Sequence, residues 1–200
     1  MARTVEIETP HGQARALLEL LPRPPGAVVL GHGAGGGVEA PDILAAARAA
    51  ARLGWSVIRV EQPYRVAGRR SPAPAAQLDV AWLAVVDRLR GKELAGVRLV
   101  TGGRSSGARV ACRTARAAGA AGVVCLAFPL QPPGRLNAPS RLPELDAVDV
   151  PVLVVQGDRD PFGMPPEAPG RTVARVGGDH GLKRGLAAVA DAVESWLPGV

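Results

Sequence analysis

Short apolar runs alternate with longer amphipathic stretches along most of the chain. The apolar runs are nearly continuous, rich in Val and Leu, and bounded by Gly, Pro or charged residues, which is typical of strands buried inside a parallel sheet. We therefore predict strands over residues 27–32, 55–61, 97–103, 122–128, 151–157 and 171–176. The amphipathic stretches between them carry apolar residues at helical spacing. They predict helices over residues 41–53, 76–90, 105–119 and 180–197.

The beginning of the chain has a different pattern, because apolar and polar residues alternate there. Alternation is typical of strands, so we predict a β-hairpin with strands over residues 4–9 and 14–20. Strands that alternate with helices after such a hairpin indicate an α/β fold, with a mostly parallel sheet, helices on both faces and antiparallel strands at one edge. The Pro-rich segments 64–75 and 129–150 are predicted as loops. Neither is long enough to link two domains, so we expect a single domain over residues 1–200.

Composition narrows the range of partners and locations. The net charge is +6, but the arginines are scattered and no aromatic residues interleave with them to stack bases, so nucleic-acid binding is not expected. Cys112 and Cys125 lie in apolar segments and do not suggest a disulfide framework. The N-terminal segment lacks the apolar stretch of a signal peptide, and no apolar run reaches the roughly 18 residues of a membrane span. We therefore expect a cytoplasmic protein.

Residues 103–107, with the sequence GRSSG, match the G-x-S-x-G motif between a predicted strand and a predicted helix. In a nucleophile elbow the serine takes a strained backbone conformation, and small residues such as Gly103 and Gly107 let the flanking chains approach. Ser105 would then lie at a helix N-terminus, where unpaired N–H groups favour a developing negative charge. The alternative is a serine that only caps the helix, with the glycines in a tight turn.

A nucleophilic serine needs a base, and the chain has three histidines. His11 lies in the predicted hairpin turn, and His32 belongs to a glycine-rich loop. His180 follows the last predicted strand, so it should lie with Ser105 at the sheet edge where the loops after parallel strands gather. A histidine that caps a helix or faces solvent is the alternative.

Two aspartates are candidates for the carboxylate that orients this base. Asp158 directly follows the strand and a glycine, where it is placed to cap the turn. Asp160 precedes Pro161 and lies further into the loop, so we prefer Asp160 as the triad acid. A turn-capping role for Asp160 alone remains the alternative.

The glycine loop in VVLGHGAGGG, residues 28–37, supports two interpretations. Gly31, Gly33 and Gly36 match the G-x-G-x-x-G of a dinucleotide-binding turn, with Glu61 near the position of a ribose-binding acid. However, four residues intervene before the next helix, a hairpin precedes the strand, and the Ser, Asp and His candidates stay unexplained. No Gly-Lys-Ser/Thr follows the glycines either, as a phosphate-binding P-loop would require. We therefore favour a loop that supplies backbone N–H groups to an oxyanion.

The segments LGHGAGGG, GGRSSGARVA, FPLQPPG and VLVVQGDRDPFG occur in this order, and with them the sequence resembles the α/β-hydrolase superfamily. Within it, the chain looks like the small capless enzymes similar to dienelactone hydrolases. The resemblance covers nearly the whole chain. It implies a three-layer sandwich with an eight-stranded, mostly parallel sheet, an antiparallel second strand and no full cap domain.

The resemblance also bears on the site. The order Ser105, Asp160, His180 is the order of the triad in this fold. The oxyanion hole would use the backbone N–H of Ser106 and that of Ala34 or Gly35. Dienelactone hydrolases proper use a cysteine nucleophile, so their specific substrate is not expected here.

These residues predict a serine hydrolase that cleaves a small ester or thioester through an acyl-enzyme, without a metal or a cofactor. A hydrolase fold kept as a binding or scaffold protein is the main alternative, and a peptidase is another. Arg104, Arg135 and Arg141 could favour an acidic substrate, although solvated arginines are the preferred interpretation. The sequence leaves the physiological substrate and the choice between monomer and homodimer open.

Overall fold

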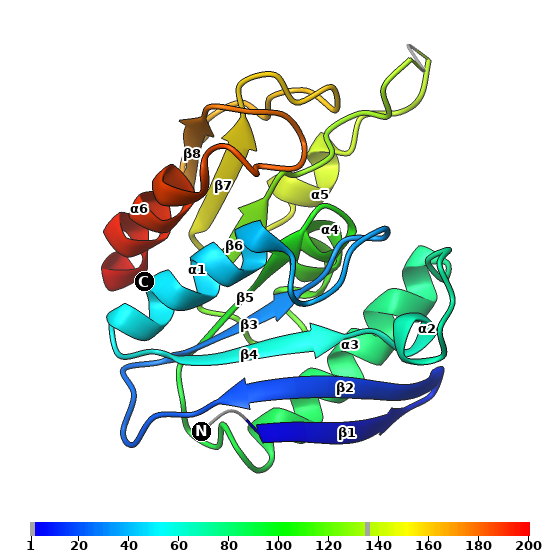
Figure 1. The fold of residues 1–200 in the computed structure, drawn as a ribbon, viewed down its shortest axis with the longest axis vertical. Helices are drawn as coiled ribbons and strands as arrows, with labels where there is room; N and C mark the ends of the chain where they lie inside the picture. The colour runs from blue at the N-terminus through cyan, green and yellow to red at the C-terminus, as the bar shows by residue number, and fades with distance from the viewer. Residues whose placement is uncertain (1–2, 135–136) are drawn as a thin grey trace.

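The computed structural model describes residues 3–134 and 137–200, which are built around one sheet of eight strands (Figure 1). The strands are β1 (Arg3–Thr9), β2 (Gly12–Glu19), β3 (Ala27–Gly31), β4 (Ser56–Glu61), β5 (Leu99–Arg104), β6 (Gly122–Leu126), β7 (Val152–Gly157) and β8 (Arg171–Val176). Their order across the sheet is β1-β2-β4-β3-β5-β6-β7-β8. Strand β2 runs antiparallel to both of its neighbours, and the remaining pairs are parallel. The predicted fold class is therefore confirmed, including the antiparallel second strand.

Helices cover both faces of the sheet. They are α1 (Pro41–Arg52), α2 (Pro63–Val66), α3 (Ala75–Arg90), α4 (Ser106–Thr114), α5 (Leu142–Asp146) and α6 (Leu186–Trp196), followed by a short 3₁₀ turn, η1 (Leu197–Gly199). In Figure 1, α1 and α6 lie in front of the sheet, and α3 and α4 lie behind it. The buried residues of β3 follow this division: Val28 and Leu30 pack in the α1–α6 cluster, whereas Ala27 and Val29 pack in the α3 cluster. Because successive strand residues point to opposite faces, β3 is apolar along its whole length.

Two short helices occupy segments that the sequence predicts as loops. Helix α2 lies at the start of the segment 64–75, and α5 lies within the segment 129–150. Each has a proline in its first turn, Pro63 in α2 and Pro143 in α5. Proline suits that position because its missing N–H would have no intrahelical acceptor. A single turn of helix is too short for apolar periodicity to reveal.

Two predicted helices are shorter in the structure. Helix α4 ends at Thr114 rather than at residue 119, and α6 begins at Leu186 rather than at residue 180. The residues before α6 form turns that include Gly181 and Gly185, since glycine has a weak preference for the helical conformation. His180 therefore lies in a loop and not on a helix.

Two further features of the described chain concern its chemistry. Cys112 and Cys125 are buried free thiols whose Sγ atoms lie 3.4 Å apart. The hydrogen bond with Cys112, together with burial, raises the pKa of the Cys125 thiol well above its ordinary value. Within residues 3–134 and 137–200, no helix has both the length and the apolar character needed to cross a membrane.

Candidate functional site

Ser105 lies at a sharp turn between β5 and α4. Its backbone has φ 51° and ψ −108°, a positive-φ conformation that residues with a Cβ atom rarely adopt. A Cβ atom on Gly103 would lie 2.5 Å from the carbonyl oxygen of Gly31, and one on Gly107 would lie 2.6 Å from the same oxygen. Both positions therefore require glycine, because β3 passes directly beside the turn. This is the geometry expected of a nucleophile elbow.

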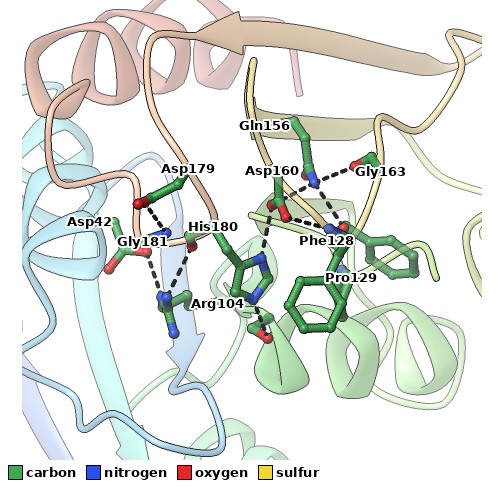
Figure 2. Close-up of polar contacts among 12 residues, drawn as sticks. Asp42, Arg104, Phe128, Pro129, Gln156, Asp160, Gly163, Asp179, His180 and Gly181 are labelled. Carbon is green, nitrogen blue, oxygen red and sulfur yellow. Dashed lines mark hydrogen bonds and ion pairs between the residues drawn. The ribbon is translucent and has the colours of Figure 1, made fainter. Parts of the chain in front are cut away.

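His180 and Asp160 form a chain of hydrogen bonds with Ser105. Figure 2 shows the contact between the Asp160 carboxylate and the His180 imidazole. The Nε2 atom of His180 lies 2.9 Å from Ser105 Oγ, and its Nδ1 atom lies 2.8 Å from Asp160 Oδ2. The three residues follow β5, β7 and β8, which are parallel strands whose carboxyl ends meet at one edge of the sheet. The structure thus brings together three residues that are up to 75 positions apart in sequence.

The environment of Asp160 differs from that of Asp158. The Asp160 side chain is 1% exposed, and its carboxylate accepts hydrogen bonds from Gln156 Nε2 at 2.9 Å and from the backbone N–H of Phe162 at 2.9 Å. The Asp158 side chain is 55% exposed, and its Oδ1 accepts from the backbone N–H of Gly178 at 2.8 Å. Asp158 therefore fastens the loop that carries His180, whereas Asp160 contacts the imidazole itself.

Two residues that the sequence analysis did not single out support this pair. Gln156, at the end of β7, is fully buried and donates to Asp160 and to the carbonyl oxygens of Phe128 and Gly163. The Phe162 ring packs on the His180 imidazole, with centroids 4.3 Å apart. A polar residue inside the apolar run of β7 was a usable signal for Gln156, because buried amides require partners. No local pattern marks Phe162.

The glycine loop after β3 lies beside Ser105. A Cβ atom on Gly33 would stand 3.5 Å from the Cβ atom of Ser105. Ala34 is half-buried, and its carbonyl oxygen accepts a hydrogen bond from Tyr64 Oη at 3.3 Å, whereas Gly35 is exposed. On the other side of the serine, Ser106 begins α4, so its backbone N–H has no acceptor within the helix. Both segments that carry the predicted oxyanion donors therefore flank the serine.

His32 has a separate environment. Its Nδ1 lies 2.8 Å from the carbonyl oxygen of Gly33, and its Nε2 accepts a hydrogen bond from the backbone N–H of Gln62 at 3.0 Å. Both ring nitrogens are thus used by the main chain, with the proton on Nδ1. Burial lowers the pKa of His32, which favours this neutral form. The geometry fits a structural role that fixes the glycine loop against the end of β4.

The remaining candidates are spread over the molecule. His11 is exposed in the hairpin turn. Arg141 donates to the carbonyl oxygen of Pro129, while Arg135 lies outside the described residues. Among the residues that the structure describes, no group of three or more His, Cys, Asp or Glu side chains is arranged to hold a metal ion.

Comparisons with known proteins agree with this architecture. Residues 24–185 match the sequence model of a family described as an alpha/beta hydrolase domain. A search of the curated proteins finds no match. Similar solved structures include a lidless α/β serine hydrolase, XC6422 from Xanthomonas campestris, at 20% identity and a TM-score of 0.80, with 99% of this chain and 94% of that chain covered.

Two other solved structures have a similar degree of likeness. Dienelactone hydrolase from Anabaena variabilis is 15% identical with a TM-score of 0.79, over 100% of this chain and 97% of the other. Est1E from Butyrivibrio proteoclasticus is 17% identical with a TM-score of 0.76, over 98% of both chains. At such identities the likeness concerns the fold.

Proposed function

The chain belongs to the alpha/beta hydrolase family, and on that premise we propose that it is a serine hydrolase of a small carboxylic ester or thioester. One observation carries the proposal. Hydrogen bonds run from Asp160 through His180 to Ser105, and the serine stands at a strained turn that exposes a helix N-terminus beside it. A serine that only caps a helix does not need a histidine and a buried carboxylate in line with it.

In the first half of the reaction, Ser105 Oγ attacks the carbonyl carbon of the substrate. His180 Nε2 takes the hydroxyl proton as the bond forms, and Asp160 holds the Nδ1–H and stabilises the imidazolium. The backbone N–H groups of Ser106 and of Ala34 or Gly35 stabilise the negative charge on the carbonyl oxygen. His180 then protonates the leaving alkoxide or thiolate, which departs and leaves an acyl-serine.

In the second half, water takes the place of the serine as nucleophile. His180 removes a proton from the water as it attacks the acyl carbon, and the same N–H groups hold the second oxyanion. The bond to Ser105 Oγ breaks, the oxygen recovers its proton from His180, and the carboxylic acid leaves. Each half of the reaction therefore begins with proton transfer to neutral His180 and ends with proton transfer from its imidazolium form.

Covalent labelling of the serine tests the proposal first. A fluorophosphonate probe reacts with an activated serine, so we expect one adduct on Ser105, located by mass spectrometry, and no adduct in Ser105→Ala. Hydrolysis of short acyl esters should disappear in the same variant. A folded wild-type protein that takes no label would argue for a hydrolase fold retained as a binding or scaffold protein.

The two aspartates offer a matched pair of variants for the triad acid. Asp160→Asn should lower kcat by about 10³- to 10⁴-fold, because the amide cannot hold the imidazole in the required tautomer. Asp158→Asn keeps an oxygen that can accept from Gly178, so kcat should stay within about threefold of wild type. Equal losses in the two variants, measured per active site, would contradict the assignment of Asp160.

A further inference from the structure

The loop that carries His180 needs to be held from outside. Residues 177–185 include four glycines, at positions 177, 178, 181 and 185, which have wide conformational freedom. Its internal bonds are local, such as the one from Leu182 N–H to the carbonyl oxygen of Asp179 at 3.1 Å. A base on such a loop stays within reach of the serine only if further contacts fix its main chain.

Arg104, the residue before the nucleophile, makes such a contact. Its Nη2 donates to the carbonyl oxygen of His180 at 3.0 Å, and its Nε donates to Asp42 Oδ2 at 3.0 Å (Figure 2). The Arg104 side chain is 18% exposed and the Asp42 side chain is 1% exposed, so the ion pair is largely removed from water. Bonds from a guanidinium are stronger than bonds between neutral groups.

Asp42 fixes the position of the guanidinium. It lies in the first turn of α1, where its Oδ1 also accepts from the backbone N–H of Ile43 at 3.0 Å. Burial raises the pKa of Asp42 from its ordinary value, and the positive charge of Arg104 opposes that shift. Removal of either partner would leave the other polar group buried without its counterpart.

The guanidinium also lies against the glycine loop. A Cβ atom on Gly33 would stand 2.9 Å from Arg104 Nη1, so the arginine occupies the space beside that glycine. One side chain therefore contacts the base loop, α1 and the glycine loop, while its backbone continues directly into Ser105.

We propose that Arg104, held by Asp42, is a positioning residue that fixes the main chain of His180 relative to the nucleophile elbow. The inference rests on the proposed hydrolase function for its effect on rate. Its Nε and Nη2 atoms donate to protein atoms, and this arrangement favours positioning over the recognition of an acidic substrate. A displacement of the base by about 1 Å is enough to lower catalysis about 100-fold.

Kinetics on the purified protein test the rate effect. Arg104→Met keeps most of the apolar stem and removes the donors, so kcat for a short acyl ester should fall about 10- to 100-fold. KM should stay within about threefold, because the ester is not bound by this residue. Arg104→Lys keeps the charge but not the geometry of two separate donor groups, so its kcat should lie between those of wild type and Arg104→Met. Asp42→Asn should also lower kcat.

Arg113 provides a matched control. It pairs with Asp79 through Nε at 2.8 Å and Nη2 at 2.7 Å, and its side chain is 20% exposed. Arg113→Met should therefore lower stability much as Arg104→Met does, yet leave kcat per active site unchanged. Equal kcat values in the two variants overturn the inference. A higher KM for acidic esters alone, with kcat unchanged, would instead assign Arg104 to substrate recognition and equally overturn it.

Hydrogen exchange makes the test independent of activity. If Arg104 fixes the loop, backbone amides of residues 177–185 should exchange faster in Arg104→Met than in wild type, and Arg113→Met should not change them. An inactive wild-type protein with this exchange pattern would refute the proposed function but keep the structural part of the inference. Unchanged exchange in Arg104→Met refutes the inference whatever the activity. Arg104→Lys carries both measurements if the methionine variant does not fold.

Discussion

Ser105 stores backbone strain at the point where the proposed chemistry takes place. A residue with a Cβ atom at φ 51° and ψ −108° occupies a region that glycine enters freely. Such strain is of the order of 1–3 kcal/mol per residue and persists only when the surroundings impose it. Here the close passage of β3 beside Gly103 and Gly107 imposes the turn.

This strain predicts an unusual order of stabilities at position 105. Ser105→Gly should be more stable than Ser105→Ala by about 1 kcal/mol, because glycine relieves the strain while its extra freedom in the unfolded chain offsets part of the gain. Urea denaturation of the two variants measures the difference. Ser106 has helical backbone geometry, so Ser106→Gly should not be more stable than Ser106→Ala. A less stable glycine variant at position 105 would mean that the turn is not strained.

The sequence reveals some of these residues and hides others for a physical reason. Ser105, Asp160 and His180 could be named because each follows a predicted strand within a recognisable pattern. The positioning contacts of Arg104 depend on Asp42 and on a main-chain oxygen 76 residues away, and no local pattern encodes such a pairing. The preferred interpretation of Arg104 as a solvated side chain is wrong, because it is 18% exposed and pairs with the buried Asp42.

His32 connects two elements, the glycine loop after β3 and the end of β4. Its Nε2 accepts from Gln62 N–H, so protonation of that nitrogen would replace an attraction by a clash of two donors. Burial lowers the pKa of His32 below the unfolded value of about 6.5. As the pH falls, the unfolded chain therefore binds a proton before the folded protein does, and stability decreases.

The pH dependence of the free energy of unfolding should reveal the contribution of His32. Its contribution is fully present above about pH 6.5 and is lost as the pH falls from there through the lowered folded pKa, with a slope of at most about 1.4 kcal/mol per pH unit. Urea denaturation across this range should show less acid sensitivity in His32→Gln than in wild type. His11→Gln, a change in the exposed hairpin turn, should keep the wild-type profile. Parallel profiles for wild type and His32→Gln would contradict the argument.

Elements were predictable where their pattern is long and regular. The strands appear close to their predicted bounds because buried apolar runs have clear limits. The prediction failed at the start of α6, where the pattern continued through residues 180–185 although two glycines there favour turns. Helices α2 and α5 were missed because one turn carries no periodicity.

At the scale of the whole molecule, the alternation of strands and helices predicts the parallel sheet, and the parallel sheet predicts that the loops meet at one edge. It does not predict the register of the strands or the distances within the site. Those depend on packing, such as the close contact that a Cβ atom on Gly157 would make with the Asp179 carbonyl oxygen at 2.6 Å. The sequence therefore indicates which loops meet at the edge of the sheet, and the structure shows how these loops are positioned relative to one another.

The net charge of +6 is also a property of the whole molecule. Many arginines pair with carboxylates on several elements: Arg3, Arg15, Arg52, Arg59, Arg88, Arg109, Arg113 and Arg171. We expect a dispersed positive charge and only weak, salt-sensitive binding of nucleic acid, with a Kd above about 1 μM at physiological salt. Fluorescence anisotropy with a labelled duplex measures it. Submicromolar binding at physiological salt that is lost in high salt would contradict this expectation and reveal a basic face.

The proposed triad spans the two helical layers. Leu182, two residues after His180, is fully buried in the α1–α6 cluster, whereas Ser105 leads into α4, whose Ala111 packs on the opposite face. The base and the nucleophile are thus anchored in different halves of the core. The proposed catalytic activity therefore depends on the packing of these two halves against each other. Local detachment of the C-terminal layer would abolish that activity while most of the chain remained folded. Inactivation on heating should therefore precede the loss of helical structure.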